Sequence, residues 1–159
     1  MTTFHSIQRE YLENWTFDYL RNQFQKQPDL YVGSFLEGRG LVGIAYGVVN
    51  EEKSAVLQGI AVRYSLWRKG IGSRLLRFFE EWVRKKGCRS VSLGSGEGPA
   101  EQFYLKNGYR PIEIKAKSED GRVLSKENVY DYSDGLRKRE LLRSNLKPKE
   151  VIFIMEKKF

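Results

Sequence analysis

The chain has 159 residues, of which 40% are hydrophobic and 13% aromatic, and this composition excludes a disordered or low-complexity protein. One cysteine excludes a disulfide framework and a cysteine-rich zinc site, and one histidine leaves almost nothing for metal binding or a Ser-His-Asp triad. Lys and Arg outnumber Asp and Glu by 28 to 20, so the chain favours anionic partners (nucleic acid, a phosphorylated cofactor or a membrane surface) or simply has a basic solvated surface.

The length predicts one domain over residues 1–159 with a core that needs neither disulfide nor metal. No stretch approaches 18 apolar residues, and the N-terminus lacks a basic-then-apolar signal pattern. A soluble, cytoplasmic protein without a membrane partner is therefore expected.

The first half of the chain is expected to hold a helical segment, three strands and a second helix. Residues 3–27 are helical in pattern, and strands are predicted at 30–37, 41–49 and 55–62. Gln58-Gly59 interrupts the third strand, which is typical of a bulge or a close approach. Apolar residues then recur with helical spacing and predict one buried stripe, made of Ile71, Leu75, Phe78, Phe79, Trp82 and Val83.

The second half alternates strands and helices. A strand at 89–93 leads through the glycine-rich loop 94–98 to a helix at 99–107, and a half-exposed strand follows at 109–117. Residues 118–149 are polar and irregular with a helix near 135–145, and the last strand is at 151–155. Because residues 55–93 form a strand-helix-strand unit with a parallel crossover, the fold class is α/β or α+β with a mixed sheet.

The segment from Trp67 to Ser73 joins a buried strand to an amphipathic helix. Gly70 and Gly72 let a ligand approach the backbone, and the first N–H groups of the helix lack internal partners. With the charges of Arg68 and Lys69 they make a cradle for a phosphate. The P-loop and GxGxxG fingerprints are both absent, and the bare GxG is also compatible with a simple strand-to-helix turn.

With its flanks, this segment resembles the GNAT superfamily of acyl-CoA-dependent N-acetyltransferases, whose signature is Arg/Gln-x-x-Gly-x-Gly/Ala after an apolar strand. Residues 100–109, AEQFYLKNGY, resemble that family's second motif, Ala-x-x-Phe/Leu-Tyr-x-x-x-Gly-Phe/Tyr. The resemblance covers residues 41–117 and 150–157. It implies a mostly antiparallel central sheet with helices on both faces, and it leaves 118–149 as a variable insertion before the last strand.

Three positions depart from the family pattern. Trp67 stands where the first motif has Arg or Gln, and Glu97 stands where an Asn is common. Val56 replaces a carboxylate that some members carry in the apolar strand, so a base in that place is missing.

The resemblance implies acetyl transfer from acetyl-CoA to a primary amine of a small molecule or peptide, by direct attack in a ternary complex. Cofactor contacts would come from the backbone of the apolar strand, from the cradle and from the second motif. These residues are Ile60, Ala61, Val62, Arg68, Lys69, Gly70, Ile71, Gly72, Ser73, Phe103 and Tyr104. No metal is implied.

Two residues are candidates for proton transfer. By resemblance Tyr104 is the general acid that protonates the departing thiolate, although it could also be a core residue beside Phe103. Glu97, at the end of a strand, is the candidate base or a solvated loop acid. Glu101, one turn before Tyr104, is expected to face water, and Cys88 is expected to be a buried, unreactive thiol.

The acceptor is left open by the sequence. The acidic and aromatic residues of 118–134 could hold a cationic amine or form a solvated loop. Residues 135–149 are basic and lack aromatics for base stacking, and Leu136, Leu141, Leu142 and Leu146 are expected to pack such a helix on the sheet.

Two other functions compete with acetyl transfer. A non-catalytic acyl-CoA-binding or sensing module would fit the missing acid at Val56, and a basic nucleic-acid-binding protein would fit the net charge. Nucleic acid is the less favoured partner, and the family resemblance makes a homodimer reasonable.

Overall fold

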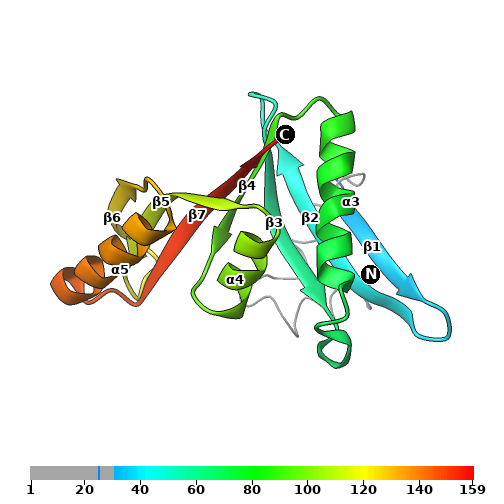
Figure 1. Ribbon diagram of the computed structural model, residues 1–159, viewed down its shortest axis with the longest axis horizontal. Coiled ribbons are helices and arrows are strands. Elements are labelled where there is room, and N and C mark those ends of the chain that lie inside the picture. Colours follow the sequence, from blue (N-terminus) through cyan, green and yellow to red (C-terminus); the bar gives the residue numbers. More distant parts are fainter. Residues whose placement is uncertain (1–24, 26–30) are drawn as a thin grey trace. The chain divides into compact units, whose positions relative to one another are not determined.

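The computed structural model describes residue 25 and residues 31–159, which form a mixed α/β fold (Figure 1). Within these ranges there are seven strands, mostly antiparallel, and three α-helices, which confirms the expected fold class. The chain divides into two compact units, residues 1–91 and 92–159, and each is described by itself. The helical pattern of residues 3–27 falls almost wholly outside the described residues, and the prediction of one domain stays a prediction.

The first unit is built on an antiparallel sheet of three strands in the order β1-β2-β3, with the parallel strand β4 next to β3. Its elements are β1 (Tyr31–Leu36), β2 (Gly40–Val49), β3 (Ala55–Val62), the 3-10 helix η2 (Tyr64–Leu66), α3 (Ile71–Lys85) and the first residues of β4 (Ser90–Ser95). The pairing between β2 and β3 shifts by one residue after Tyr46, because Gln58 is an extra residue on β3. The bulge predicted at this point is confirmed.

Helix α3 packs on this sheet where β2 has no side chains (Figure 1). A Cβ on Gly43 would lie 2.8 Å from a methyl carbon of Leu75, and a Cβ on Gly47 would lie 2.8 Å from the ring of Phe79. Both contacts are shorter than side chains tolerate, so the helix sits directly on the strand backbone.

The buried stripe of α3 differs from the predicted one. The fully buried apolar residues are Leu75, Leu76, Phe79 and Val83, whereas Phe78 is 58% exposed and Trp82 is 42% exposed. At 100° per residue, Phe78 and Trp82 lie about a quarter of a turn or more from the centre of the buried arc. Their assignment to the core was wrong because apolar spacing alone did not show which side of the helix meets the sheet.

The second unit pairs three antiparallel strands in the order β7-β5-β6, and helix α5 packs on β5 and β7. Besides the rest of β4, its elements are α4 (Pro99–Lys106), β5 (Arg110–Lys117), β6 (Val123–Asn128), α5 (Tyr132–Leu146) and β7 (Glu150–Lys158). Strand β6 lies in the stretch 118–149, for which the sequence predicts only irregular structure and one helix. Nearly all of its residues are exposed, so it carries no apolar alternation that a sequence pattern detects.

Helix α5 is longer than predicted and turns a different face to the strands. It begins at Tyr132 because the side chain of Asp131 caps it, accepting a hydrogen bond from the Asp134 N–H at 2.8 Å. Its buried residues are Gly135, Arg139 and Leu142, whereas Leu141 is 56% exposed and Leu146 is 41% exposed. Of the predicted leucine stripe, Leu142 is buried and Leu136 half-buried, whereas the prediction is wrong at Leu141 and Leu146.

Two smaller expectations can be compared directly. Cys88 is buried, as expected, and burial raises the pKa of its thiol. In the part of the chain that the structure describes, no helix has both the length and the apolar content that a membrane crossing requires.

Substituting Gly47 tests the close approach of α3. In Gly47→Ala the added methyl would lie 2.1 Å from the carbonyl oxygen of Val56 as well as against Phe79, so the helix must move. We expect a loss of about 1–3 kcal/mol in the free energy of unfolding, measured by urea denaturation. Gly96→Ala is the control, because nothing lies within 4 Å of a Cβ there. Equal stability of the two variants would contradict the packing described.

Candidate active site

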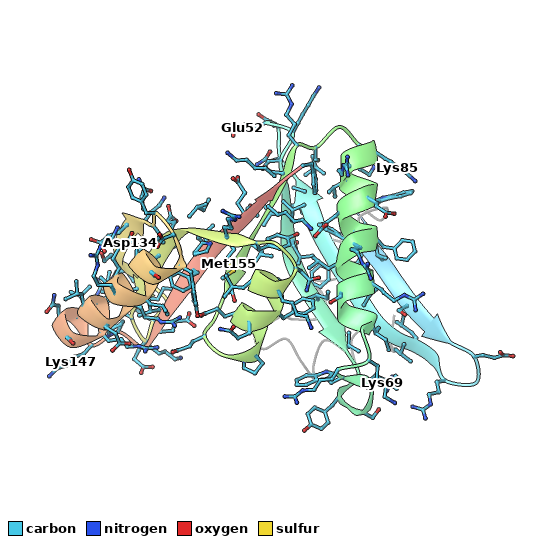
Figure 2. The ribbon with its side chains drawn as sticks, in the orientation of Figure 1. Glu52, Lys69, Lys85, Asp134, Lys147 and Met155 are labelled. Carbon is cyan, nitrogen blue, oxygen red and sulfur yellow. The ribbon has the colours of Figure 1, made fainter. Side chains whose placement is uncertain are left out.

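The first turn of α3 presents uncapped backbone N–H groups beside two cations. Gly70, the N-cap, has φ of 78°, in the left-handed region that suits glycine, and no side chain caps the helix. Arg68 has φ of 62°, and both Arg68 and Lys69 are exposed (Figure 2, where Lys69 is labelled). No acidic residue stands in the first turn. The partial positive charge of the helix end and these two cations make a site for an anion such as a phosphate.

Trp67, which departs from the family motif, fastens the loop that leads to this turn. Its indole N–H donates to the carbonyl oxygen of Val62 at 2.7 Å, and its ring lies 4.9 Å from that of Tyr64. The Trp67 backbone N–H also bonds to the Tyr64 carbonyl at 3.1 Å. The tryptophan therefore ties the end of β3 to the start of α3, and contributes no charge to the cradle.

The residues of β3 expected to contact the cofactor lie just beyond the bulge. Ile60 and Val62 are half-buried, and Ala61 is buried in a small cluster with Ile44. The side-chain oxygen of Gln58 is buried and has no hydrogen-bond partner among the described residues. A buried acceptor such as this oxygen, at a bulge where strand pairing is interrupted, is suited to accept a hydrogen bond from an N–H group of a ligand.

Tyr104 lies on α4 in the second unit, and it is buried. Its ring packs edge-to-face against Phe103 at 5.2 Å and against Tyr109 at 5.9 Å. Burial disfavours the phenolate and raises the pKa of Tyr104 to about 12. The hydroxyl therefore keeps its proton throughout the physiological range.

Glu97, in the loop before α4, is paired with two arginines of α5. Its carboxylate accepts a hydrogen bond from Arg143 and lies 3.6 Å from the guanidinium of Arg139. The hydrogen bond from Arg143, followed by the charge of Arg139, holds the pKa of Glu97 below its usual value. This pairing makes the carboxylate a weaker base than a free one.

Glu101 is buried, and the expectation that it faces water was wrong. Arg139 donates to both carboxylate oxygens of Glu101, at 2.6 and 3.3 Å, and the Tyr132 hydroxyl donates at 2.6 Å. The Arg139 guanidinium also lies 5.0 Å from the centre of the Phe153 ring. Burial and the bond to Glu101 raise the pKa of Tyr132. This network joins α4, the helix of Tyr104, to α5 and β7.

Two of the acidic residues that could hold a cationic amine, Asp131 and Asp134, hold the start of α5. Asp134 accepts from the Tyr130 N–H at 3.0 Å and pairs with Lys138 at 3.1 Å, and the first of these contacts contributes most to a pKa of about 2. Asp131 is the helix cap. Of the aromatics in this segment, Tyr132 serves the buried network and Tyr130 is 97% exposed.

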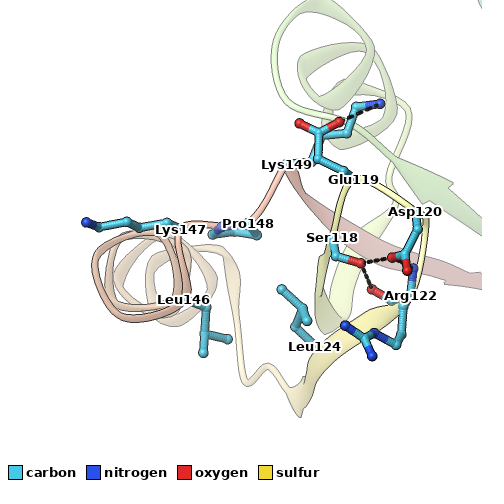
Figure 3. A pocket seen from close by; sticks show the side chains of 9 residues that line it. All are labelled: Ser118, Glu119, Asp120, Arg122, Leu124, Leu146, Lys147, Pro148 and Lys149. Carbon is cyan, nitrogen blue, oxygen red and sulfur yellow. Dashed lines mark hydrogen bonds and ion pairs between the residues drawn. The ribbon is translucent and has the colours of Figure 1, made fainter.

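A shallow hollow in the second unit lies between the turn after β5 and the end of α5 (Figure 3). The Ser118 hydroxyl bonds to Asp120 at its rim, and Lys149 lies 3.7 Å from Glu119. None of the predicted site residues lines this hollow. Among the described residues, no cluster of three or more His, Cys, Asp or Glu side chains is arranged to hold a metal.

The structure thus groups the predicted site residues in two sets. The cradle residues and the β3 residues belong to the first unit, and Glu97, Phe103 and Tyr104 belong to the second. Comparison with known proteins agrees with both motifs, because the profile described as the acetyltransferase (GNAT) family matches residues 1–109. The chain belongs to the GNAT acetyltransferase family.

A curated relative of this GNAT chain matches less than half of it. The tRNA(Met) cytidine acetyltransferase TmcA of Aeropyrum pernix is 37% identical over 70 residues, which are 44% of this chain and 10% of that protein. The chain thus spans about a tenth of the length of this relative.

Solved structures share the fold over nearly the whole chain. Ard1 from Thermoplasma volcanium has a TM-score of 0.72 at 18% identity, over 99% of this chain and 91% of that one. The PaiA N-acetyltransferase from Thermoplasma acidophilum, in complex with coenzyme A, has a TM-score of 0.58 at 22% identity, over 98% and 77%.

Sequence reasoning missed Arg139, Arg143 and Tyr132 as neighbours of the site. Their partners Glu97 and Glu101 are 31 to 46 residues away in the chain. Gly135, Arg139 and Leu142 are spaced four and three residues apart, as buried residues of one helix face are. Because arginine is charged, a search for apolar residues at this spacing does not find the buried face.

Removing Arg139 tests the buried network. Arg139→Met leaves the Glu101 carboxylate buried without its cation, and we expect a loss of about 3–5 kcal/mol in the free energy of unfolding. The double variant Glu101→Gln/Arg139→Met should lose less, since no buried charge remains. Urea denaturation gives both values. Arg137→Met is the matched control, because that side chain is 73% exposed and, among the described residues, its ion pair is with Asp134. If Arg137→Met cost as much as Arg139→Met, the network would not be the cause.

Proposed function

We propose that this chain transfers an acetyl group from acetyl-CoA to a primary amine of a small molecule or peptide, by direct attack in a ternary complex. The observation that carries the proposal is the uncapped start of α3, where Gly70 adopts a left-handed conformation after the apolar strand β3. Membership of the GNAT family supplies the reaction type. PaiA in complex with coenzyme A has the same fold and supports the cosubstrate.

The residues at the cradle fit a pyrophosphate. The backbone of residues 70–73 would hold phosphate oxygens at the helix end, and Arg68 and Lys69 would neutralise their charge. The bulged part of β3, with the free acceptor of Gln58, would orient the amide-bearing arm of the cosubstrate. This arrangement supports binding through backbone groups even though Trp67 replaces a polar side chain of the motif.

Tyr104 is proposed as the general acid. Attack of the amine nitrogen on the thioester carbonyl carbon forms a C–N bond and breaks the C–S bond, so the leaving sulfur needs a proton. Tyr104, whose raised pKa of about 12 keeps its hydroxyl protonated, would give its proton to the sulfur as the C–S bond breaks, and the proton that the amine nitrogen loses on becoming an amide would restore the phenol. The single cysteine, Cys88, is buried, which supports direct transfer rather than an acetylated thiol.

Glu97 stays a prediction as the proton acceptor. Its lowered pKa and its two arginine partners support a different role, in which Glu97 holds the loop before α4 to α5. In that case the amine reaches its neutral form by losing a proton to a water molecule or by its own acid–base equilibrium in solution. The two roles differ in Glu97→Gln, because loss of a base removes the acidic limb of the pH profile and loss of a contact does not.

The acceptor class rests on the fold relatives. Naa20 from Chaetomium thermophilum, solved with a bisubstrate analogue, has a TM-score of 0.70 at 16% identity over all of this chain and 82% of that one. The E. coli ribosomal-protein-S18-alanine N-acetyltransferase has a TM-score of 0.63. These relatives support a peptide amine as the first acceptor to test.

Cosubstrate binding is tested by thermal unfolding with acetyl-CoA, with ATP and NAD as controls. At a hundred times its dissociation constant, acetyl-CoA should stabilise the chain by about 2.7 kcal/mol, or roughly 5–11 °C. Gly70→Asp places a carboxylate where phosphate is proposed and should weaken binding at least about fivefold. Gly70→Asn, the isosteric control, should bind nearly as the parent does. Equal stabilisation by NAD, or equal affinity of the two variants, would contradict the cradle.

Replacing Tyr104 tests the acid. Tyr104→Phe keeps the ring that packs against Phe103 and Tyr109 but removes the hydroxyl, so acetyl-CoA affinity should change little. Turnover on peptide and small amines should fall by about 10²–10⁴-fold. Tyr109→Phe is the matched control, because it removes a hydroxyl from a neighbouring buried ring that is not among the predicted site residues. Unchanged turnover would remove Tyr104 from the mechanism, and parent protein that binds acetyl-CoA but acetylates no amine would indicate a non-catalytic module.

A further inference from the structure

Helix α3 carries two exposed aromatic side chains on its outer side. Phe78 and Trp82 are four residues apart, so they lie one above the other on neighbouring turns. The helix already buries Leu75, Leu76, Phe79 and Val83 on the sheet, so its packing on the fold does not need the exposed pair. Single exposed aromatics are ordinary on a protein surface, but this pair occurs in a strongly charged setting.

The charges around the pair are almost all positive. From residue 68 to residue 89, Glu81 is the one exposed acid among the described residues, against eight exposed cations, which are Arg68, Lys69, Arg74, Arg77, Arg84, Lys85, Lys86 and Arg89. On the same helix Arg77 comes one residue before Phe78 and Lys85 three residues after Trp82, and within the described part of the chain neither forms an ion pair. Figure 2 shows Lys69 and Lys85 at opposite ends of α3. Phe78, Trp82, Arg77 and Lys85 are called the outer face of α3 below.

We propose that the outer face of α3 binds single-stranded nucleic acid. Two aromatic rings one turn apart offer stacking surfaces for unpaired bases, and the arginine and lysine beside them suit the phosphates between those bases. The helix of 15 residues is about 22 Å long, which gives room for several nucleotides. This surface is separate from the cradle at residues 68–73 and does not depend on the proposed acetyl transfer.

Two other anionic partners fit the outer face less well. An anionic membrane needs a broad apolar face to insert, whereas the apolar face of α3 is already buried on the sheet and only two rings are exposed. A nucleic-acid duplex would use the cations but keeps its bases stacked on one another, so Phe78 and Trp82 would add nothing. Both are distinct outcomes of the experiment below.

Fluorescence anisotropy with a labelled 12-nucleotide oligouridylate tests the proposal on the full chain. Affinity should fall about sevenfold between 50 and 200 mM salt if the two cations of the outer face each neutralise one phosphate. A duplex RNA of the same length and vesicles containing anionic phospholipid should bind more weakly than the oligouridylate at equal salt. Saturating acetyl-CoA should leave the affinity unchanged, because the cradle is a separate site.

Variants separate stacking from charge. Phe78→Ala and Trp82→Ala should each weaken oligouridylate binding at least about fivefold, and Arg77→Gln/Lys85→Gln should reduce the salt slope by about 1.4. Tyr130→Ala and Arg110→Gln/Arg122→Gln are matched controls, since they remove an exposed aromatic and two exposed cations elsewhere. All of these variants should unfold at nearly the parent temperature, because the side chains are at the surface.

The proposal is overturned by any of three results. The first is oligouridylate binding that the aromatic variants leave unchanged, or no binding at 50 mM salt. The second is duplex binding as tight as single-strand binding. The third is binding to anionic vesicles that needs Phe78 and Trp82 while the oligouridylate does not, which would identify a membrane partner.

Discussion

The contact on which the first unit depends is the direct approach of α3 to the backbone of β2. Gly43 and Gly47 remove two side chains from the strand, so Leu75 and Phe79 reach the sheet and the helix axis is fixed by backbone contact. With the axis fixed, the start of the helix must meet the end of β3 through a short loop. Trp67 closes that loop on the Val62 carbonyl, and Gly70 takes the left-handed turn. The anion cradle is thus a consequence of how the helix packs.

The second unit depends on a buried ion pair instead of a close backbone contact. Taking the charges of Glu101 and Arg139 out of water costs several kcal/mol per ion, and the pair is tolerated because two guanidinium bonds, the Tyr132 hydroxyl and the Phe153 ring compensate them. Such a network has one good geometry. It therefore fixes α4, whose next turn carries Tyr104, relative to α5. The chain thus uses a helix outside both motifs to brace the helix of its proposed acid.

The charge excess of the chain has more than one use. Arg139 and Arg143 form ion pairs with Glu97 and Glu101 inside the second unit. Arg137 and Lys138 pair with Asp134 on α5. Eight exposed cations lie instead on and around α3. There they serve two chemically different tasks in our proposals, which are to hold a pyrophosphate at the helix start and to attract a nucleic-acid strand along the helix side. A net charge does not distinguish these uses, because it carries no information on where the cations lie.

Local patterns in the sequence determined most of the elements. The periods of apolar residues and the two motifs around Gly70 and Tyr104 are properties of short stretches, and the sequence alone identified the GNAT fold from them. Tertiary structure alone decided the burial of Glu101, the exposure of Phe78 and Trp82, the pairing of β6, and the partners of Glu97. Each of these depends on residues far apart in the chain: Arg139 follows Glu101 by 38 positions, and the sheet selects which side of α3 is buried. The spacing of apolar residues shows which residues can share a face of a helix or strand. Whether that face is buried depends on the element that packs against it.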